Sequence, residues 1–343
     1  MADALGLGPS GSNPMEVRLL SSAQSMKKII INKDNSGIRL DKFLVKEFFL
    51  LGLTRGEIIR KIKNGEVLVN DKKAKPSYVL RPGDAISSKF KVKSSKLMSN
   101  QDLEIKVVYQ DENIIVINKP AGVSVHPTKP NEKNTLVNFL IYKFPEIRDI
   151  HDPSNSSGQV NLRPGIVHRL DKDTSGVMVV ARNQESFEEL KKLFKEHKIE
   201  KKYLALVYGK FKDKEGVIEK PIARAANYRK QVIAGRKTKT KIREAMTRYR
   251  VIKEYENYSL VEAMPKTGRM HQIRIHMFSI GHPIAGDKIY KLKNTKKAEI
   301  FRQMLHAQSI EFTLLGKKYK FKAEFPKDLS DTLKRLDPVR SSS

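Results

Sequence analysis

Residues 168–180 read HRLDKDTSGVMVV and join a polar turn to an apolar run. The apolar half has the length and composition of a buried strand, and the residues before it favour a turn. The polar half places Asp171 between two cationic residues, Arg169 and Lys172. Neighbouring positive charge favours the ionised form of a carboxylate, which acts as a nucleophile or base. The same pattern is also typical of a plain turn that leads into a core strand, so the residues alone leave both interpretations open.

The charge balance indicates the kind of partner. The chain has 343 residues, with 67 Lys and Arg against 38 Asp and Glu, which gives a net charge of +29. This length favours two domains, and this charge indicates a polyanionic partner, nucleic acid first and an anionic membrane surface second. No apolar run approaches the roughly 20 residues that cross a bilayer, so we expect no transmembrane segment. The absence of cysteine excludes disulfides and thiolate chemistry, which suits the cytoplasm.

The N-terminal part divides into a leader and a small domain. Residues 1–26 are small and polar and lack the features of a signal peptide, so we expect a disordered leader. Residues 27–88 then predict a domain that starts with a strand at 27–32. Leu40, Phe43, Leu44 and Phe48 repeat with helical spacing. A second helix is predicted to begin at Thr54 with a capping box, to end at Gly65, and to lead into a strand and an Asn70-Asp71 turn. Three cations crowd one face of this helix, either as plain solvated surface or as an RNA contact: Arg55, Arg60 and Lys61.

The rest of the chain predicts an α+β domain. Residues 89–103 favour a flexible linker, residues 104–330 the second domain, and residues 331–343 a tail. Strands are predicted at 105–109, 114–118, 177–181, 203–208, 258–263, 310–314 and 319–325, and helices at 135–144, 186–198 and 271–280. Helices interrupt this series without alternating regularly with strands, which favours a largely antiparallel mixed sheet. No glycine-rich phosphate motif is present, so no nucleotide cofactor is expected.

Several blocks resemble, in order, the bacterial large-subunit ribosomal RNA pseudouridine synthases. Besides residues 165–182 around Asp171, the matching blocks are Asn118–Val123 with His126-Pro127, Lys202–Ala205, Thr267–His276, Gly281–Asp287 and Leu305–Ala307. Residues 39–44, the helix start at Thr54 and residues 65–70 resemble the RNA-binding module of the ribosomal-protein-S-four type. The resemblance implies a pseudouridine synthase fold with this module appended, and a basic module helix that faces RNA.

The resemblance also implies roles for individual residues. Asp171 would be the catalytic group, attacking the sugar or the base or removing a sugar proton. Arg169 would fill the space left by a flipped-out uridine, since a guanidinium both stacks on bases and meets phosphate. Tyr203 would pack on the uracil, although a tyrosine in a strand is as often a core residue. Arg274 would pair with Asp171, ahead of Arg269 and His271, and these two would contact RNA together with His168.

Two further groups of residues have plain alternatives. The histidines show no spacing typical of metal ligands, so no metal is expected. A basic stretch between residues 224 and 250, including Arg229 and Arg236, corresponds to family loops that grip RNA, or is a solvated loop.

The sequence thus predicts a pseudouridine synthase that acts on large-subunit (23S) ribosomal RNA or a pre-ribosomal particle. We expect no cofactor, a monomer and a cytoplasmic location. The alternatives are a synthase directed at transfer RNA and a non-catalytic RNA-binding factor in ribosome assembly.

Overall fold

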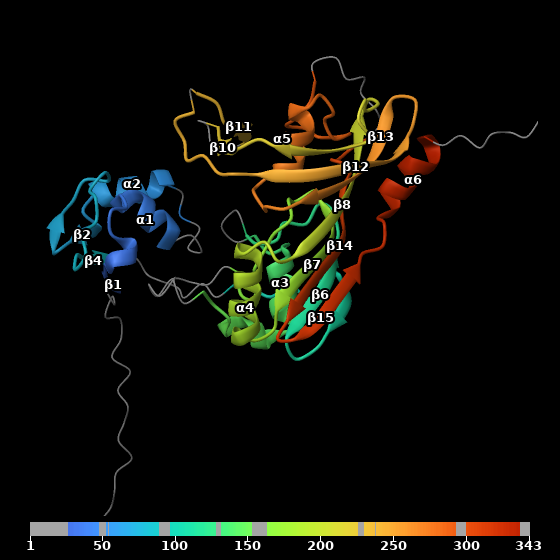
Figure 1. Cartoon of the computed structure of the whole chain (residues 1–343). Helices are drawn as coiled ribbons and strands as arrows, with labels where there is room; N and C mark the ends of the chain where they lie inside the picture. Colours follow the sequence, from blue (N-terminus) through green and yellow to red (C-terminus); the bar gives the residue numbers. More distant parts are fainter. Residues whose placement is uncertain are drawn as a thin grey trace, which may run out of the picture. The chain divides into compact units, whose positions relative to one another are not determined.

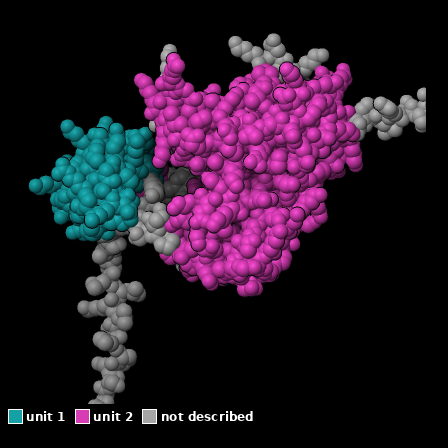
Figure 2. Space-filling model, in the orientation of Figure 1, with its two compact units in different colours: residues 1–45, 54–94 teal, residues 46–53, 95–343 magenta. Residues whose placement is uncertain are grey.

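The computed structural model describes residues 27–47, 53, 55–88, 97–127, 132–152, 163–225, 230–236, 238–292 and 300–336. The predicted leader, Phe48, Thr54, Arg229 and the last seven residues therefore lie outside the described residues. The chain divides into two compact units, residues 1–45 with 54–94 and residues 46–53 with 95–343 (Figure 2). Among the described residues, no helix has the length and apolar character needed to cross a bilayer.

The N-terminal unit is a small sheet with two helices. Its elements are β1 (Lys27–Ile30), α1 (Leu40–Glu47), α2 (Arg55–Lys63), β2 (Val67–Val69), β3 (Lys72–Lys73) and β4 (Ala85–Ser88). The strands pair antiparallel in the order β1-β4-β2-β3. Leu40, Phe43 and Leu44 of α1 are buried, as are Ile58 and Ile62 of α2, so the predicted apolar faces are confirmed. Gly65, Asn70 and Asp71 have positive φ angles where the helix end and the turn were predicted.

The second unit is built on a mixed sheet (Figure 1). Its strands are β5 (Lys106–Gln110), β6 (Ile114–Lys119), β7 (Ser175–Ala181), β8 (Glu200–Tyr208), β9 (Glu215–Glu219), β12 (Met246–Glu254), β13 (Tyr258–Pro265), β14 (Leu305–Leu314) and β15 (Lys317–Lys322). The order is β5-β6-β7-β14-β8-β13-β12-β9, with β15 paired to β14. Among these described strands, β7 with β14 is the one parallel pair, so the predicted α+β, largely antiparallel sheet is confirmed.

Helices cover both faces of this sheet because its strands alternate apolar side chains. The helices are α3 (Leu136–Lys143), α4 (Gln184–Lys195), α5 (Gln272–Ser279) and α6 (Lys327–Leu336), and a hairpin of β10 (Ile222–Arg224) and β11 (Gln231–Ile233) lies beside α5. In β8, Ala205 and Val207 pack with residues of α5, whereas Leu204 and Leu206 pack with α6. Strand β7 is buried along its whole length, as its apolar run predicted.

Two predicted boundaries differ from the structure. The expected tail from residue 331 falls inside α6, whose Leu329 is fully buried and whose Leu333 and Leu336 pack on the same core. The spacing of these leucines is helical, and it is the signal that the sequence analysis missed. The predicted linker 89–103 is also too long, because Leu97 is buried in the core and the Asn138 side chain donates to the Met98 carbonyl.

Candidate active site

Asp171 lies in a loop that leads into β7. Its carbonyl accepts a hydrogen bond from the Thr174 N–H at 3.1 Å, which closes the predicted turn. Gly176 follows at φ +123, where β7 meets β14, and a Cβ at this position would lie 2.2 Å from the Ala307 carbonyl oxygen. Only glycine permits this approach, so the turn and the parallel strand pairing together fix the position of Asp171.

Two cations hold the main chain directly after Asp171. Lys119, at the end of β6, is fully buried, and its Nζ donates to the carbonyls of Pro120, Val123 and Lys172 at 2.8 to 3.0 Å. Burial lowers the pKa of Lys119 to about 7, although the charges of Asp171 and Asp173 oppose this shift. Arg302 donates to the Asp173 carbonyl at 3.2 Å. Neither cation was predicted to have a role, although Lys119 lies in the matching block Asn118–Val123.

Asp171 is bonded to Arg274, and Arg274 is fixed in turn by a second carboxylate. The Arg274 Nη1 donates to the Asp171 Oδ2 at 2.8 Å, so the expected contact is present. On its other edge the guanidinium donates to both oxygens of Asp287, at 2.6 and 2.9 Å. The Arg274 side chain is 5% exposed and that of Asp287 0%. Burial alone would lower the pKa of Arg274, but the hydrogen bonds and charges of Asp287 and Asp171 raise it.

Tyr203 and His271 lie around the same carboxylate. Tyr203, on β8, is partly buried, and its burial together with the charge of Asp171 raises the pKa of its phenol. It is therefore a neutral ring with a proton to donate. His271 has φ +57, and its Nε2 lies 3.8 Å from the Asp171 Oδ2. The Tyr290 hydroxyl lies 3.1 Å from the other ring nitrogen of His271, and burial lowers the pKa of the imidazole.

Three adjoining cavities meet at Arg169. The smallest, about 80 Å³, is lined by Asp171, Tyr203 and Arg274. Larger cavities of about 460 and 320 Å³ adjoin it, and Arg169 lines all three. The Arg169 side chain is exposed and makes no hydrogen bond to another described residue that would hold it in place.

The other predicted RNA contacts have mixed surroundings. Arg269 lines two of the cavities, and His168 lines the largest, where its ring accepts from the Val179 N–H and stacks on Phe194. Burial lowers the pKa of His168 to about 3, so His168 is a neutral wall of the cavity and not a cationic contact. Arg236 is exposed after β11.

In the N-terminal unit, two of the predicted contacts are already paired with carboxylates. Arg55 donates to the buried Asp41 at 2.6 Å, and Lys61 pairs with Glu66 at 2.7 Å, while Arg60 is exposed. Arg55 is therefore held at the surface by an ion pair that the sequence analysis did not foresee. Among the described residues of the whole chain, no three carboxylate or imidazole side chains are grouped as metal ligands would be.

Comparison with known proteins defines the class. Residues 113–279 match the RNA pseudouridylate synthase family and residues 38–86 the S4 domain family. The chain belongs to the RNA pseudouridine synthases, and it is an isomerase of that class.

Individual relatives extend over most of the chain. It is 41% identical over 260 residues to an uncharacterized RNA pseudouridine synthase of Aquifex aeolicus, covering 75% of this chain and 78% of that protein. It is 34% identical to the ribosomal large subunit pseudouridine synthase D of Zymomonas mobilis, covering 90% of this chain and 97% of that protein. The solved structure of human RNA pseudouridylate synthase domain containing 4 is 26% identical with a TM-score of 0.52, over 67% of this chain and 92% of the human one.

Proposed function

We propose that this enzyme isomerises specific uridines of bacterial large-subunit ribosomal RNA, and that Asp171 is its catalytic carboxylate. The observation that carries the proposal is the position of Asp171. It is the one acidic residue among those that line the cavity of about 80 Å³, and it is bonded to an arginine that the buried Asp287 fixes on the opposite edge. A charged group held in this way is preorganised to react.

The reaction needs few groups from the protein. The bond between N1 of uracil and C1′ of ribose breaks, the base turns, and C5 bonds to C1′. The proton on C5 leaves and N1 receives one, so the product is an isomer of the substrate. Asp171 can start this sequence by attacking the sugar or the base or by removing a sugar proton. Tyr203, as a neutral phenol beside the carboxylate, offers a flat face for the uracil and a proton.

The uridine must leave its helix to reach Asp171, and Arg169 is suited to fill the gap. Its exposed guanidinium stands where the three cavities meet, and a guanidinium stacks on bases while its charge meets phosphate.

The choice of RNA rests on relatives. Proteins named ribosomal large subunit pseudouridine synthase D from three bacteria are 32% to 35% identical and cover 88% to 91% of this chain. These matches extend over both units. We therefore assign the same class of RNA to this enzyme, with the N-terminal unit as a second contact with the RNA backbone.

The test is chemical mapping of pseudouridine in ribosomal and transfer RNA after incubation with the wild type and with Asp171→Asn. Asparagine keeps the shape but cannot act as a charged base or nucleophile, so we expect product formation to fall by at least about 1,000-fold. Asp331→Asn is the control, because it removes an exposed carboxylate on α6 and should leave the product pattern unchanged.

The other outcomes are equally informative. Normal turnover by Asp171→Asn would refute the catalytic assignment. Pseudouridine sites found only in transfer RNA would show that the assigned class of RNA is wrong. RNA binding without pseudouridine in any RNA would favour an assembly factor.

A further inference from the structure

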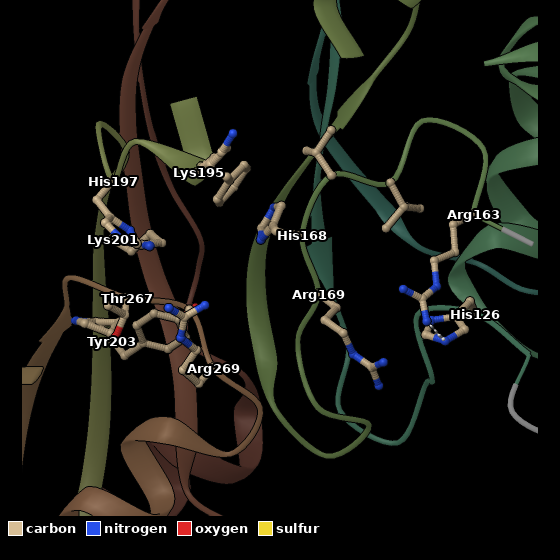
Figure 3. A pocket seen from close by; sticks show the side chains of 15 residues that line it. His126, Arg163, His168, Arg169, Lys195, His197, Lys201, Tyr203, Thr267 and Arg269 are labelled. Atoms are coloured by element: carbon tan, nitrogen blue, oxygen red, sulfur yellow. Dashed lines mark hydrogen bonds between the residues drawn. The ribbon is translucent and has the colours of Figure 1, made fainter. Parts of the chain in front are cut away.

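The largest of the three cavities has no role in the reaction described above. It has a volume of about 460 Å³, within the range of small-molecule sites, and shares Arg169, Tyr203 and Arg269 with the Asp171 cavity. Figure 3 shows Lys201, Tyr203 and Arg269 on one side, Arg163, Arg169 and His126 on the other, and His168 between them. Its occupant must therefore be a neighbour of whatever binds at Asp171.

The walls combine positive charge with apolar surface. Ile166, Val167, Phe194 and Pro265 contribute apolar area, and none of the residues that line the cavity is acidic. Its cations are Arg163, Arg169, Lys195, Lys201 and Arg269. A ligand that suits these walls has a flat, weakly polar part and at least one negative charge.

Two histidines in the walls are neutral, because burial lowers the pKa of His168 to about 3 and that of His126 to about 4. The Val179 N–H donates to the Nε2 of His168, and Arg163 donates to the Nε2 of His126 at 3.0 Å, so in both rings the proton is on Nδ1. His126 is 7% exposed, and its buried Nδ1 has no hydrogen-bond partner among the described residues. Both rings therefore add uncharged surface to the walls, and the positive charge of the cavity comes from its arginines and lysines.

The third cavity, which Arg169 also lines, is less suited to an anion. It has about 320 Å³ and is lined by the carboxylates of Asp171 and Asp173 as well as by cations. Of the two spaces beside the Asp171 cavity, the one without carboxylates favours a phosphate.

We infer that the cavity of about 460 Å³ binds an unstacked nucleotide of the substrate RNA, next in the strand to the target uridine. The inference rests on the proposed function, because it takes the uridine to be bound at Asp171. The base of this second nucleotide lies against the apolar wall, and its phosphate meets Lys195 and Lys201. Extruding the uridine already breaks its stack on this neighbour, so extruding the neighbour costs one further stacking step, and the second cavity compensates by holding its base.

The first experiment measures binding without chemistry. A fluorescein-labelled pentauridylate is titrated with Asp171→Asn protein, with and without the added changes Lys195→Gln and Lys201→Gln. We expect these two changes to weaken binding about tenfold and to reduce the salt slope by about 0.7 for each lost phosphate contact. The matched control adds Lys192→Gln and Lys202→Gln, which remove the same charge from the same helix and strand outside the cavity. Equal loss in both variants, or no loss in either, would overturn the inference.

The second experiment tests the base. An RNA that the wild type modifies is prepared with an abasic nucleotide directly 5′ or directly 3′ of the target uridine. We expect KM to rise about tenfold for one of the two with little change in kcat, because one stacked base is lost. Unchanged KM for both would refute a base site.

The two proposals fail in different ways. If the wild type forms no pseudouridine in any RNA but binding of the pentauridylate still depends on Lys195 and Lys201, the proposed function fails, and what stands is a nucleotide site without a target uridine beside it. If pseudouridine forms but binding of the pentauridylate does not depend on Lys195 and Lys201, only the inference about the nucleotide site fails.

Discussion

The substitution Asp287→Asn tests how far Asp287 stabilises the active site by holding Arg274 in place. Asp287 accepts two hydrogen bonds from Arg274 and two from the backbone N–H groups of Ile289 and Tyr290. The variant keeps one oxygen but turns an amide toward the guanidinium, which leaves Arg274 buried with Asp171 as its remaining carboxylate partner among the described residues.

The magnitude follows from burial. Breaking a buried ion pair by changing one partner costs about 3 to 5 kcal/mol, and the retained oxygen places this change near 3 kcal/mol. For a domain of this size that is a loss of about 6 to 12 °C in melting temperature. Because Asp287 acts through Arg274, we also expect kcat to fall about 100-fold from a misplaced Asp171.

Two assays check these values. Thermal unfolding without RNA measures the stability change, and release of tritium from RNA labelled at C5 of uracil measures turnover, because C5 loses its hydrogen in the reaction. Asp331→Asn, a change at an exposed carboxylate on α6, is the control. Wild-type melting together with wild-type turnover in Asp287→Asn would show that Arg274 needs no second carboxylate, and the reasoning would be wrong.

Two further predictions concern the loop support and the N-terminal unit. The folded state lowers the pKa of Lys119 to about 7, so between pH 7 and 10 the unfolded chain binds more protons and stability rises with pH. In Lys119→Met the free energy of unfolding should rise by roughly 4 kcal/mol less between pH 7 and pH 10 than in the wild type, as measured by denaturant unfolding at the two pH values. An equal rise in the variant and the wild type would contradict this prediction. Deletion of residues 1–90 should leave the second unit folded, because that unit has its own core, but should raise KM for ribosomal RNA, most of all at low salt, where phosphate contacts contribute most to binding. An unchanged KM for ribosomal RNA at low salt would show that the N-terminal unit does not dock the substrate.

The sequence predicted local features well and distant contacts poorly. Strand β7 and helix α4 follow directly from their apolar patterns, and the contact of Arg274 with Asp171 followed from a family resemblance. The role of Asp287 was not predicted, although this residue lies in the matching block Gly281–Asp287, because its contact with Arg274 depends on a turn after α5 that no local pattern describes. The role of Lys119 was missed for a related reason, since a lysine inside an apolar block gives no sign that its amine bonds three carbonyls.

The place of β14 in the sheet has a consequence for biosynthesis. This strand lies between β7 and β8, yet it follows both by about a hundred residues in the chain. All strands of the N-terminal unit have been synthesised by residue 88, so this unit can fold while translation of the second unit continues. The sheet that carries Asp171 must wait until its middle strand has been made, with the facing edges of β7 and β8 unpaired in the meantime. In the nascent chain, the N-terminal unit can therefore be folded well before the sheet that carries Asp171 is complete.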